Sequence, residues 1–488
     1  MVNLLPSCLT RRPRICVKTK NIWLICAKYL RLPNLRNRYI LVMNYFKIVA
    51  VFCLAAVINW LAPDVLQHLA HLEGAEATLA ATLWCLSLFL VFGWLCSKVS
   101  EGTLFPSFTL QLLVGIVLHD ALAPLSAQLV LAVVVCTALA AIILKSGGDE
   151  IERRNFLKIA FPTLMIATVG YLVTFFVMFP VLLWLGLDSK TAALLSAIIG
   201  STDPAALIPT LKNLVFKPQF KQVSDLAVAE SALNDAVGAI FTGAVAAMVL
   251  ADVSMDSVGQ LATGLFSGEN LNLLAAQFGL GLVAGVLGWL GMYAFERYKS
   301  KRSAQGKLDA PYDFALVLAV PLGTFLIAQL MHGNGFLAAF VAGLLANFNH
   351  GNHDFHGLLH NLEVKIESVA KPTIFMMVGP FVALPQLVET AGLGLSVSLV
   401  FMVLARPLAV FVSLLPTRVP RENKLFMCAV RETGVIPVVL AVITVAQFPE
   451  LTQLMPLTAW VVIWTLTVLP AVTPWWARQL NMLTPPAP

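Results

Sequence analysis

Apolar stretches of helical length, separated by short polar loops, run through almost the whole chain. A helix needs about 20 apolar residues to cross the hydrocarbon core of a bilayer, and about 14 stretches reach or approach that length. Because backbone groups in lipid must be satisfied within the segment, the pattern predicts an all-α polytopic membrane protein. The predicted spans are residues 45–62, 78–97, 103–119, 127–144, 159–186, 191–211, 225–250, 272–296, 312–331, 334–349, 370–388, 393–416, 425–446 and 455–477.

The distribution of Lys and Arg supports this set of spans. If the N-terminus is cytoplasmic and the spans alternate, Lys190 is the one basic residue in an outside loop, and Arg406 and Arg431 lie within spans. The long outside loops 63–77 and 251–271 carry acidic residues but no Lys or Arg. By the positive-inside rule, both termini are predicted to be cytoplasmic.

The composition excludes an ordinary soluble protein. The chain of 488 residues is 59% hydrophobic and 12% charged, whereas soluble domains carry roughly 25% charged residues. The 8 cysteines show no metal-type spacing, so we expect neither a disulfide framework nor a redox role. We also expect no cofactor and no nucleic acid partner.

The two ends of the chain are predicted to lie outside the membrane domain. Residues 1–44 are basic and acid-free. They are either an interfacial segment held at anionic lipid or a stretch upstream of a true start at Met43. Residues 45–478 form the predicted membrane domain, and residues 479–488 a short cytoplasmic tail.

An acidic motif lies inside the seventh span, where the sequence reads Glu230-Ser231-Ala232-Leu233-Asn234-Asp235. A carboxylate at the membrane centre costs about 2.5–3.5 kcal/mol on insertion scales, so it is rare and usually functional. Ser231 and Asp235 are four residues apart and share a helix face, and Glu230 and Asn234 share the neighbouring face. We interpret Ser231 and Asp235 as cation ligands and Glu230 as a structural or tuning group.

A second motif, Gly200-Ser201-Thr202-Asp203-Pro204, lies inside the sixth span. Pro204 removes a backbone donor and frees carbonyls about one turn earlier. Unwound backbone at membrane depth is tolerated where it lines a cavity, and its carbonyls can bind Na⁺. Thr202 and Asp203 are therefore predicted to offer carbonyl, hydroxyl and carboxylate oxygens together. The alternative is that the acids are helix-end caps near an interface.

The thirteenth span has a matching irregularity at Gly434, three residues before a proline. Two interrupted helices, within 191–211 and 425–446, at corresponding places of two inverted halves are typical of a secondary transporter. Arg406 in the twelfth span is the counter-charge predicted for Glu230. Arg431 and Glu432 are interpreted as a mutual pair or as residues near the cytoplasmic end.

Four of the eight histidines fall in one predicted inside loop. Their neutral-range titration makes them candidate pH-regulatory groups, and their spacing could also hold a metal weakly. A solvated loop without a special role is the simplest interpretation. These residues are His350, His353, His356 and His360.

At the motifs above the chain resembles the monovalent cation:proton antiporter superfamily, and in particular the NhaP-type sodium/proton antiporters, relatives of the sodium/hydrogen exchangers. GSTDPAALIPTLK resembles the family's Thr-Asp-Pro helix, ESALNDAVGAIF its Glu-Ser-x-x-Asn-Asp helix, and ARPLAVF its buried arginine. The resemblance covers roughly residues 78–478.

The resemblance implies a role for each matching residue. Asp235 is the carboxylate that exchanges cation for proton, and Asp203, the Thr202 backbone and Ser231 complete the site. Na⁺ is then bound at Asp203 and Asp235.

The same resemblance implies a structural role for Glu230 paired with Arg406. The Asn234-Asp235 pair, instead of two aspartates, implies electroneutral exchange. Further implications are a homodimer in the cell (inner) membrane with a core of 13 helices, to which 45–62 adds one at the front.

Two stretches depart from the family pattern. Lys145-Ser146-Gly147-Gly148 stands where a Phe-Glu-Gly-Gly stretch is usual, and Arg431-Glu432-Thr433-Gly434 where Arg-Gly is usual. Both bear on ion preference and pH response.

The function predicted is therefore exchange of Na⁺ or Li⁺ for H⁺ by alternating access, with no enzymatic activity. K⁺/H⁺ exchange by the same fold is the main alternative. A cation channel or sensor is a remote one, and so is an intramembrane aspartyl protease, whose Gly-x-Gly-Asp motif the chain lacks.

Overall fold

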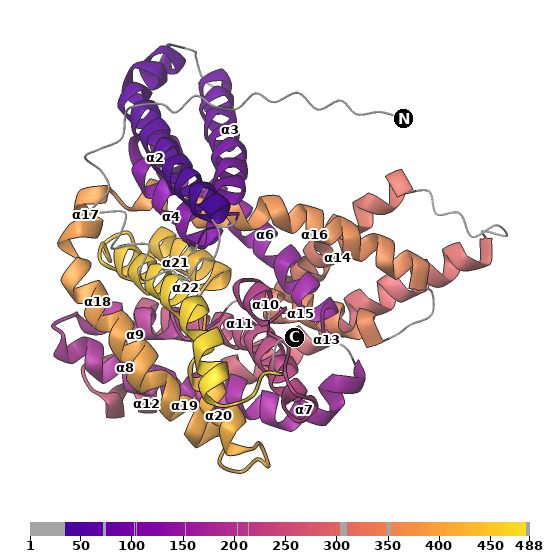
Figure 1. Ribbon diagram of the computed structural model, residues 1–488. Helices are drawn as coiled ribbons and strands as arrows, with labels where there is room; N and C mark the ends of the chain where they lie inside the picture. Colours follow the sequence, from indigo (N-terminus) through magenta and orange to yellow (C-terminus); the bar gives the residue numbers. More distant parts are fainter. Residues whose placement is uncertain are drawn as a thin grey trace, which may run out of the picture.

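In the computed structural model shown in Figure 1, all regular secondary structure of the described residues is helical, apart from an isolated bridge between Phe216 and Leu483. The all-α prediction is confirmed for these residues. Asp203 and His350 lie outside them, as does most of the segment 1–44. The described residues are 35–71, 75–101, 103, 105–151, 153–202, 204–212, 214–302, 310–348 and 353–484.

The first two helices, α2 (Leu35–Ala70) and α3 (Ala75–Ser100), stand side by side at the top of Figure 1. Helix α2 begins ten residues before the predicted span 45–62 and contains Met43. It continues into the predicted loop 63–77 through Pro63.

The third predicted span, 103–119, corresponds to helix α4 (Ser107–Val117). Helix α4 meets α5 (His119–Ala127), which extends beyond the predicted span, at a bend of 81°. The side chain of Asn59 in α2 stabilises this bend: its oxygen accepts from the Ala121 N–H at 3.0 Å, and its amide donates to Asp120 at 2.9 Å. Helix starts leave N–H groups without partners, so a side-chain acceptor there favours a new helix.

Helix α6 (Leu129–Asp149) is followed by one long helical path made of α7 (Arg153–Met165), the π-helix η1 (Ile166–Gly170) and α8 (Tyr171–Trp184). This path corresponds to the long predicted span 159–186. A π turn inside a helix is often found at functional sites.

The sixth predicted span is interrupted, as the sequence predicted. Helix α9 (Ser189–Ile198) ends before the motif, and α10 (Pro204–Lys212) begins after it. Pro204 is the first residue of α10, the position where its missing N–H has no helical partner to lose. The next helix, α11 (Lys221–Leu250), is continuous.

The middle of the chain forms α12 (Val258–Leu265), α13 (Gly268–Arg302), α14 (Ala310–Leu330) and α15 (Gly335–Phe348). Helix α12 is short and lies in a region predicted as an outside loop. Ser257 caps its N-terminus by accepting from the N–H of Gln260 at 3.3 Å.

The predicted loop before the eleventh span is wrong. Helix α16 (His353–Met376) begins 17 residues before the predicted span 370–388. It ends inside that span. A 3₁₀ turn, η3 (Gly379–Phe381), and the short helix α17 (Leu384–Glu389) follow. The polar start of α16 is typical of a loop in the sequence, yet it is helical in the structure.

The last spans are α18 (Ala391–Val400) with the π-helix η4 (Phe401–Ala405) and α19 (Arg406–Ser413), then α20, α21 and α22. The thirteenth predicted span is interrupted as expected, between α20 (Arg421–Cys428) and α21 (Val435–Gln447).

The final helix, α22 (Leu454–Gln479), is followed by a tail that pairs with the loop between α10 and α11. The Lys217 N–H donates to the Met482 carbonyl and the Thr484 N–H to the Val215 carbonyl, both at 2.9 Å. The start of the predicted tail 479–488 is therefore bound to the membrane domain.

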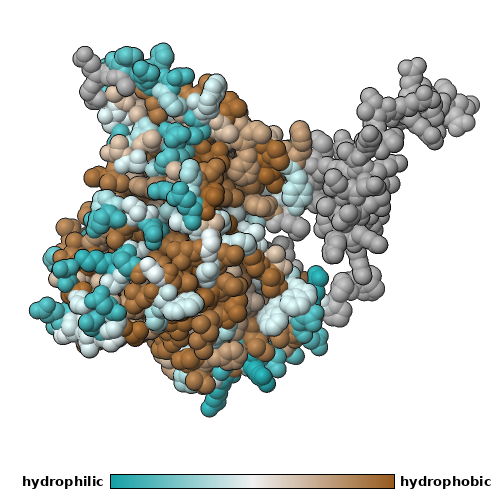
Figure 2. Space-filling view, turned by 90° about the vertical axis from the view of Figure 1, so that its left-hand side faces the viewer, coloured by the Kyte–Doolittle hydropathy of each residue, from teal (hydrophilic) through white to brown (hydrophobic). Residues whose placement is uncertain are grey.

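The chain is a multi-pass membrane protein. Among the described residues, 8 helices are long and apolar enough to cross a membrane, or 9 if the bent pair α4–α5 counts as one span. Both interrupted helices have halves too short for that test, so the predicted total of about 14 remains a prediction. Figure 2 shows broad hydrophobic areas on one face of the molecule, as contact with lipid requires.

Helix α11 is the most enclosed of the long spans. In its apolar window 72% of the residues are buried, against 22% in α2 and in α13. It lies near the centre of Figure 1, beside α10. The carboxylates of Glu230 and Asp235 on α11 are therefore buried in protein.

Lys190 and Asp252 form an exposed ion pair with an Nζ–Oδ1 distance of 2.9 Å. The contact raises the pKa of Lys190 and lowers the pKa of Asp252, because each charge and hydrogen bond favours the ionised form of the other. The one basic residue predicted outside thus lies beside an acid of the predicted outside loop.

Candidate functional site

The two helix breaks meet inside the protein. The buried guanidinium of Arg431, in the second break, donates from Nη2 to the carbonyl of Gly200, in the first, at 2.5 Å. Segments 231 residues apart in sequence are therefore joined at their irregular parts.

The end of α9 is held by a tyrosine as well as by Arg431. The hydroxyl of Tyr171 donates to the Ala197 carbonyl at 2.7 Å. A Cβ added at Gly200 would overlap the ring of Tyr171 at Cε2, so only glycine allows this close packing. Carbonyls at a helix C-terminus carry partial negative charge, and here two side-chain donors satisfy them.

Arg406 likewise donates to backbone carbonyls at the end of α20. Its Nε donates to the Met427 carbonyl at 2.9 Å and its Nη2 to the Val430 carbonyl at 2.8 Å. Each interrupted helix thus ends its first half at an arginine. Gly434 is the residue from which α21 restarts.

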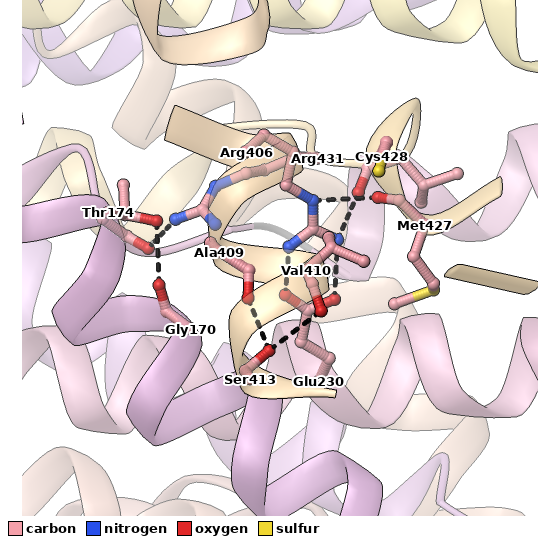
Figure 3. Close-up of polar contacts among 12 residues, drawn as sticks. Gly170, Thr174, Glu230, Arg406, Ala409, Val410, Ser413, Met427, Cys428 and Arg431 are labelled. Carbon is pink, nitrogen blue, oxygen red and sulfur yellow. Dashed lines mark hydrogen bonds and ion pairs between the residues drawn. The ribbon is translucent and has the colours of Figure 1, made fainter. Parts of the chain in front are cut away.

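Arg406 also forms the ion pair with Glu230 that the sequence predicted. Two hydrogen bonds join the side chains, Nη1 to Oε1 at 2.5 Å and Nη2 to Oε2 at 2.8 Å, as Figure 3 shows. Glu230 is 2% exposed and Arg406 is 1% exposed. A planar, doubly bonded pair of this kind fixes α11 against α19 and against the end of α20.

The polar stripe of α11 faces the first break. Ser231, Asn234 and Asp235 are all buried. One turn further along the same stripe, a Cβ added at Gly238 would lie 2.8 Å from the Cβ of Ser201. Helix α11 therefore packs directly on the unwound segment, with its carboxylate on the adjoining turn.

Several buried polar atoms near this contact have no hydrogen-bond partner within the described part of the chain. They are Thr202 Oγ1, Ser231 Oγ, Thr433 Oγ1 and both amide atoms of Asn234. Buried polar groups are normally satisfied, so such a group of atoms indicates a binding function. Carbonyl, hydroxyl and carboxylate oxygens beside unwound helices are the environment in which transporters bind Na⁺.

The sequence did not predict the contact of Arg431 with the first break. Arg431 lies at the crossing of the two breaks and over the ring of Phe401, 5.0 Å from the ring centroid. Its position inside an apolar run next to Gly434 was the available signal. Tyr171 and Thr433 gave no signal, because nothing in their local sequence separates them from ordinary core residues.

The histidine group differs from its prediction. His353, His356 and His360 lie within the first eight residues of α16 and not in a loop. The described residues contain no group of three or more His, Cys, Asp or Glu side chains that could hold a metal ion.

A cavity of about 530 Å³ opens between the end of α6, α7, α10 and the start of α11. We call it the vestibule. Its polar lining includes Asp149, Glu150, Asp225, Lys212, Asn155 and Asn347. Among the described lining residues, three are acids and one is a base. It lies at helix ends that the Lys/Arg distribution predicts to be cytoplasmic.

Comparison with known proteins agrees with this architecture. The family described as "Sodium/hydrogen exchanger, transmembrane" matches residues 86–479. A solved structure of the sodium proton antiporter MjNhaP1 from Methanocaldococcus jannaschii superposes with a TM-score of 0.69, covering 83% of this chain and 99% of that one at 21% identity.

Similar curated proteins carry two kinds of name. The K(+)/H(+) antiporter NhaP of Alkalimonas amylolytica is 27% identical over 62% of this chain and 49% of its own length. The K(+)/H(+) antiporter NhaP2 of Shewanella oneidensis is 28% identical, over 71% of this chain and 58% of its own. The Na(+)/H(+) antiporter 1 of M. jannaschii is 26% identical, over 73% of this chain and 82% of its own. The chain thus spans about half the length of the first two relatives.

Proposed function

Because the chain belongs to the sodium/hydrogen exchanger family, we propose that it exchanges a monovalent cation, Na⁺ or Li⁺, for a proton across the membrane. The observation that carries the proposal is the contact between two helix breaks beside the buried stripe of Ser231, Asn234 and Asp235 on α11. Members of this family are secondary transporters and not enzymes.

The proposed mechanism is competition for one carboxylate. Asp235 holds either a proton or the cation, and Asp203, the Thr202 backbone and Ser231 supply further oxygens. Because the two cannot occupy Asp235 together, each crossing carries one or the other. The neutral Asn234 beside Asp235 leaves one exchanging charge, so we propose that the exchange is electroneutral.

Glu230 and Arg406 have a positioning role in this proposal. Their ion pair joins α11 to the carbonyls that end α20, and Arg431 joins the second break to the first. The helices that bear the ligands are thereby held to one another. They can move as a unit when the site opens alternately to the two sides.

K⁺ is the second candidate for the cation. The support comes from the relatives named K(+)/H(+) antiporter in A. amylolytica and S. oneidensis. Na⁺ and K⁺ differ in the ligand distances they require, and the same oxygen types serve both. Transport measurements with each cation therefore decide between Na⁺ and K⁺.

We further propose a homodimer in the cell membrane with both termini in the cytoplasm. The Lys/Arg distribution supports this orientation, and the family resemblance supports the dimer. The lipid bilayer is then the remaining partner of the broad hydrophobic surface.

The test is cation-dependent exchange in proteoliposomes that contain a pH-sensitive dye, with Na⁺, Li⁺ and K⁺ added in turn. The wild type should move protons against at least one of them, and Asp235→Asn should abolish that exchange. Asp256→Asn, at an exposed acid of the outside loop, is the matched control and should exchange normally. Exchange by Asp235→Asn at the wild-type rate would reject the assignment.

A further inference from the structure

A second pocket opens beside the vestibule. It has a volume of about 450 Å³ and lies between α7, the start of α11 and the loop that joins α19 to α20. Ile159 lines both pockets, so α7 is a wall that they share. Helices α7, α19 and α20 lie at the lower edge of Figure 1. We call this second pocket the basic pocket, after Lys158 and Arg418 in its lining.

The two bases of the basic pocket come from different elements. Lys158 belongs to α7 and Arg418 to the loop between α19 and α20, and both are exposed. Neither forms an ion pair with a described side chain, and the described lining residues include no acid. Two cationic groups that converge on one concave site favour an anion between them. Arginine in particular matches the geometry of a phosphate group.

A buried amide in the same lining also lacks a partner. Asn423, in the first turn of α20, is 6% exposed, and its Oδ1 has no hydrogen-bond partner within the described part of the chain. Buried polar groups are normally satisfied, so this atom indicates a ligand. An amide offers both a donor and an acceptor, and it can therefore bond a phosphate oxygen or a headgroup hydroxyl.

The loop that carries Arg418 is held in place by the protein itself. The carbonyl of Leu414, at the end of α19, accepts from the Nζ of Lys424 at 2.7 Å and from the hydroxyl of Thr417 at 2.8 Å. Pro416 and Pro420 flank Arg418 and restrict the backbone there. The loop is thus tied to α20 across its own width, which fixes the position from which Arg418 reaches the pocket.

Exposed apolar side chains continue from the basic pocket along both of its walls. Phe161 lines the pocket and is exposed, as is Leu164 one turn further along α7. On the other wall, Val412 and Leu415 are exposed just before Pro416. The π-helix η1, which continues α7, packs against α19. An anion that carries hydrocarbon chains would cover these side chains, whereas a free phosphate would leave them uncovered.

The basic pocket lies on the side of the membrane where anionic lipid is expected. Lys158, the loop before α11 and Arg418 all belong to segments that the Lys/Arg distribution predicts to be cytoplasmic. The cytoplasmic leaflet carries a negative surface potential, and basic pockets between helices on that side bind lipid headgroups.

We propose that the basic pocket binds an anionic phospholipid of the cytoplasmic leaflet. The phosphate accepts hydrogen bonds from Lys158 and Arg418, Asn423 bonds the headgroup, and the acyl chains lie along the exposed side chains of α7 and α19. Such a lipid contacts α7, α11 and the α19–α20 loop together, and α11 carries Asp235. By holding these helix ends together, the lipid is expected to stabilise the protein and to accelerate exchange. The effect on exchange rests on the proposed function, and the lipid site itself does not.

The first test measures binding without transport. Thermal unfolding of the purified full-length chain in detergent is followed with increasing phosphatidylglycerol, because a ligand of the folded state raises the melting temperature. The wild type should respond to phosphatidylglycerol but not to phosphatidylcholine. Lys158→Gln and Arg418→Gln should each need about tenfold more lipid for the same rise, since each loses a hydrogen bond to a charged group. Both side chains are exposed, so neither substitution should impair folding.

Arg421→Gln is the matched control for this test. It removes the same charge three positions after Arg418, from an exposed residue outside the described lining, and should respond like the wild type. An unchanged response to phosphatidylglycerol in the double variant Lys158→Gln/Arg418→Gln would overturn the proposal. An equal rise with inorganic phosphate alone would contradict a lipid as the occupant.

The second test compares exchange in phosphatidylcholine proteoliposomes prepared with and without phosphatidylglycerol. The wild type and Arg421→Gln should exchange faster when phosphatidylglycerol is present, and Lys158→Gln/Arg418→Gln should exchange at the same rate in both. A double variant that gains as much as the wild type would contradict the effect on exchange. If the wild type exchanges no cation in either membrane, the proposed function fails, while thermal unfolding still decides the existence of the lipid site.

Discussion

At the scale of single residues, the two buried acids of α11 differ in their surroundings. Glu230 accepts two hydrogen bonds from Arg406, while Asp235 lies one turn before Gly238, where α11 packs against Ser201 of the first helix break. A carboxylate locked to a guanidinium is poorly suited to bind and release a cation. The ion pair therefore supports the positioning role proposed for Glu230, and Asp235 is the exchanging group in the proposed mechanism.

Glu230→Ala should lower the free energy of unfolding by about 3–5 kcal/mol, because it leaves the Arg406 guanidinium buried without its carboxylate. Thermal unfolding in detergent would measure this as a lower melting temperature. Adding Arg406→Met to the same variant should recover part of the loss, since the orphaned charge is then gone. Equal melting temperatures for Glu230→Ala and the parent would show that the pair is dispensable.

At the scale of helices, the sequence predicted the interruptions but not every boundary. Pro204 and Gly434 mark the two breaks by local backbone chemistry, and the structure interrupts both helices there. The bend after α4 depends on Asn59, which is 62 positions before the N–H that it accepts from. A contact between residues so far apart in the chain produces no recognisable pattern in the local sequence.

Helix α16 illustrates the same limit. Its polar residues predict a loop, and nothing in the local sequence predicts that Glu363 is buried. The compensating Lys145 is 218 positions away, in a stretch that departs from the family pattern. The contact between Lys145 and Glu363 could therefore be found only from the three-dimensional arrangement of the helices.

Gly200→Ala tests the packing of the first break. The new methyl group would overlap the Tyr171 ring, so we expect a loss of about 1–3 kcal/mol of stability and slower exchange. Gly323→Ala in α14 is the control, because no neighbouring atom lies within 4 Å of a Cβ there. That variant should be neutral or slightly more stable. A Gly200→Ala protein that unfolds and transports like the parent would rule out a close contact.

At the scale of the whole molecule, the fold concentrates polar chemistry in its centre and leaves apolar helices outside. Helix α11 is enclosed, and both breaks pack near it, whereas only 22% of the apolar window of α2 and of α13 is buried. The free-energy cost of burying Glu230 and Asp235 is lower in that setting, because protein groups replace water around them. The general architecture could be predicted from hydropathy and the Lys/Arg distribution, since both depend on the membrane and not on tertiary contacts.

The most direct measurement is proton release from the purified protein when cation is added at constant pH. If proton and cation compete for Asp235, adding Na⁺, or K⁺ should that be the substrate, must displace protons from the wild-type protein into a weakly buffered solution. Asp235→Asn should release none, while Asp256→Asn should release as many as the wild type. Cation binding without proton release in the wild type, or undiminished release from Asp235→Asn, would contradict exchange at this carboxylate.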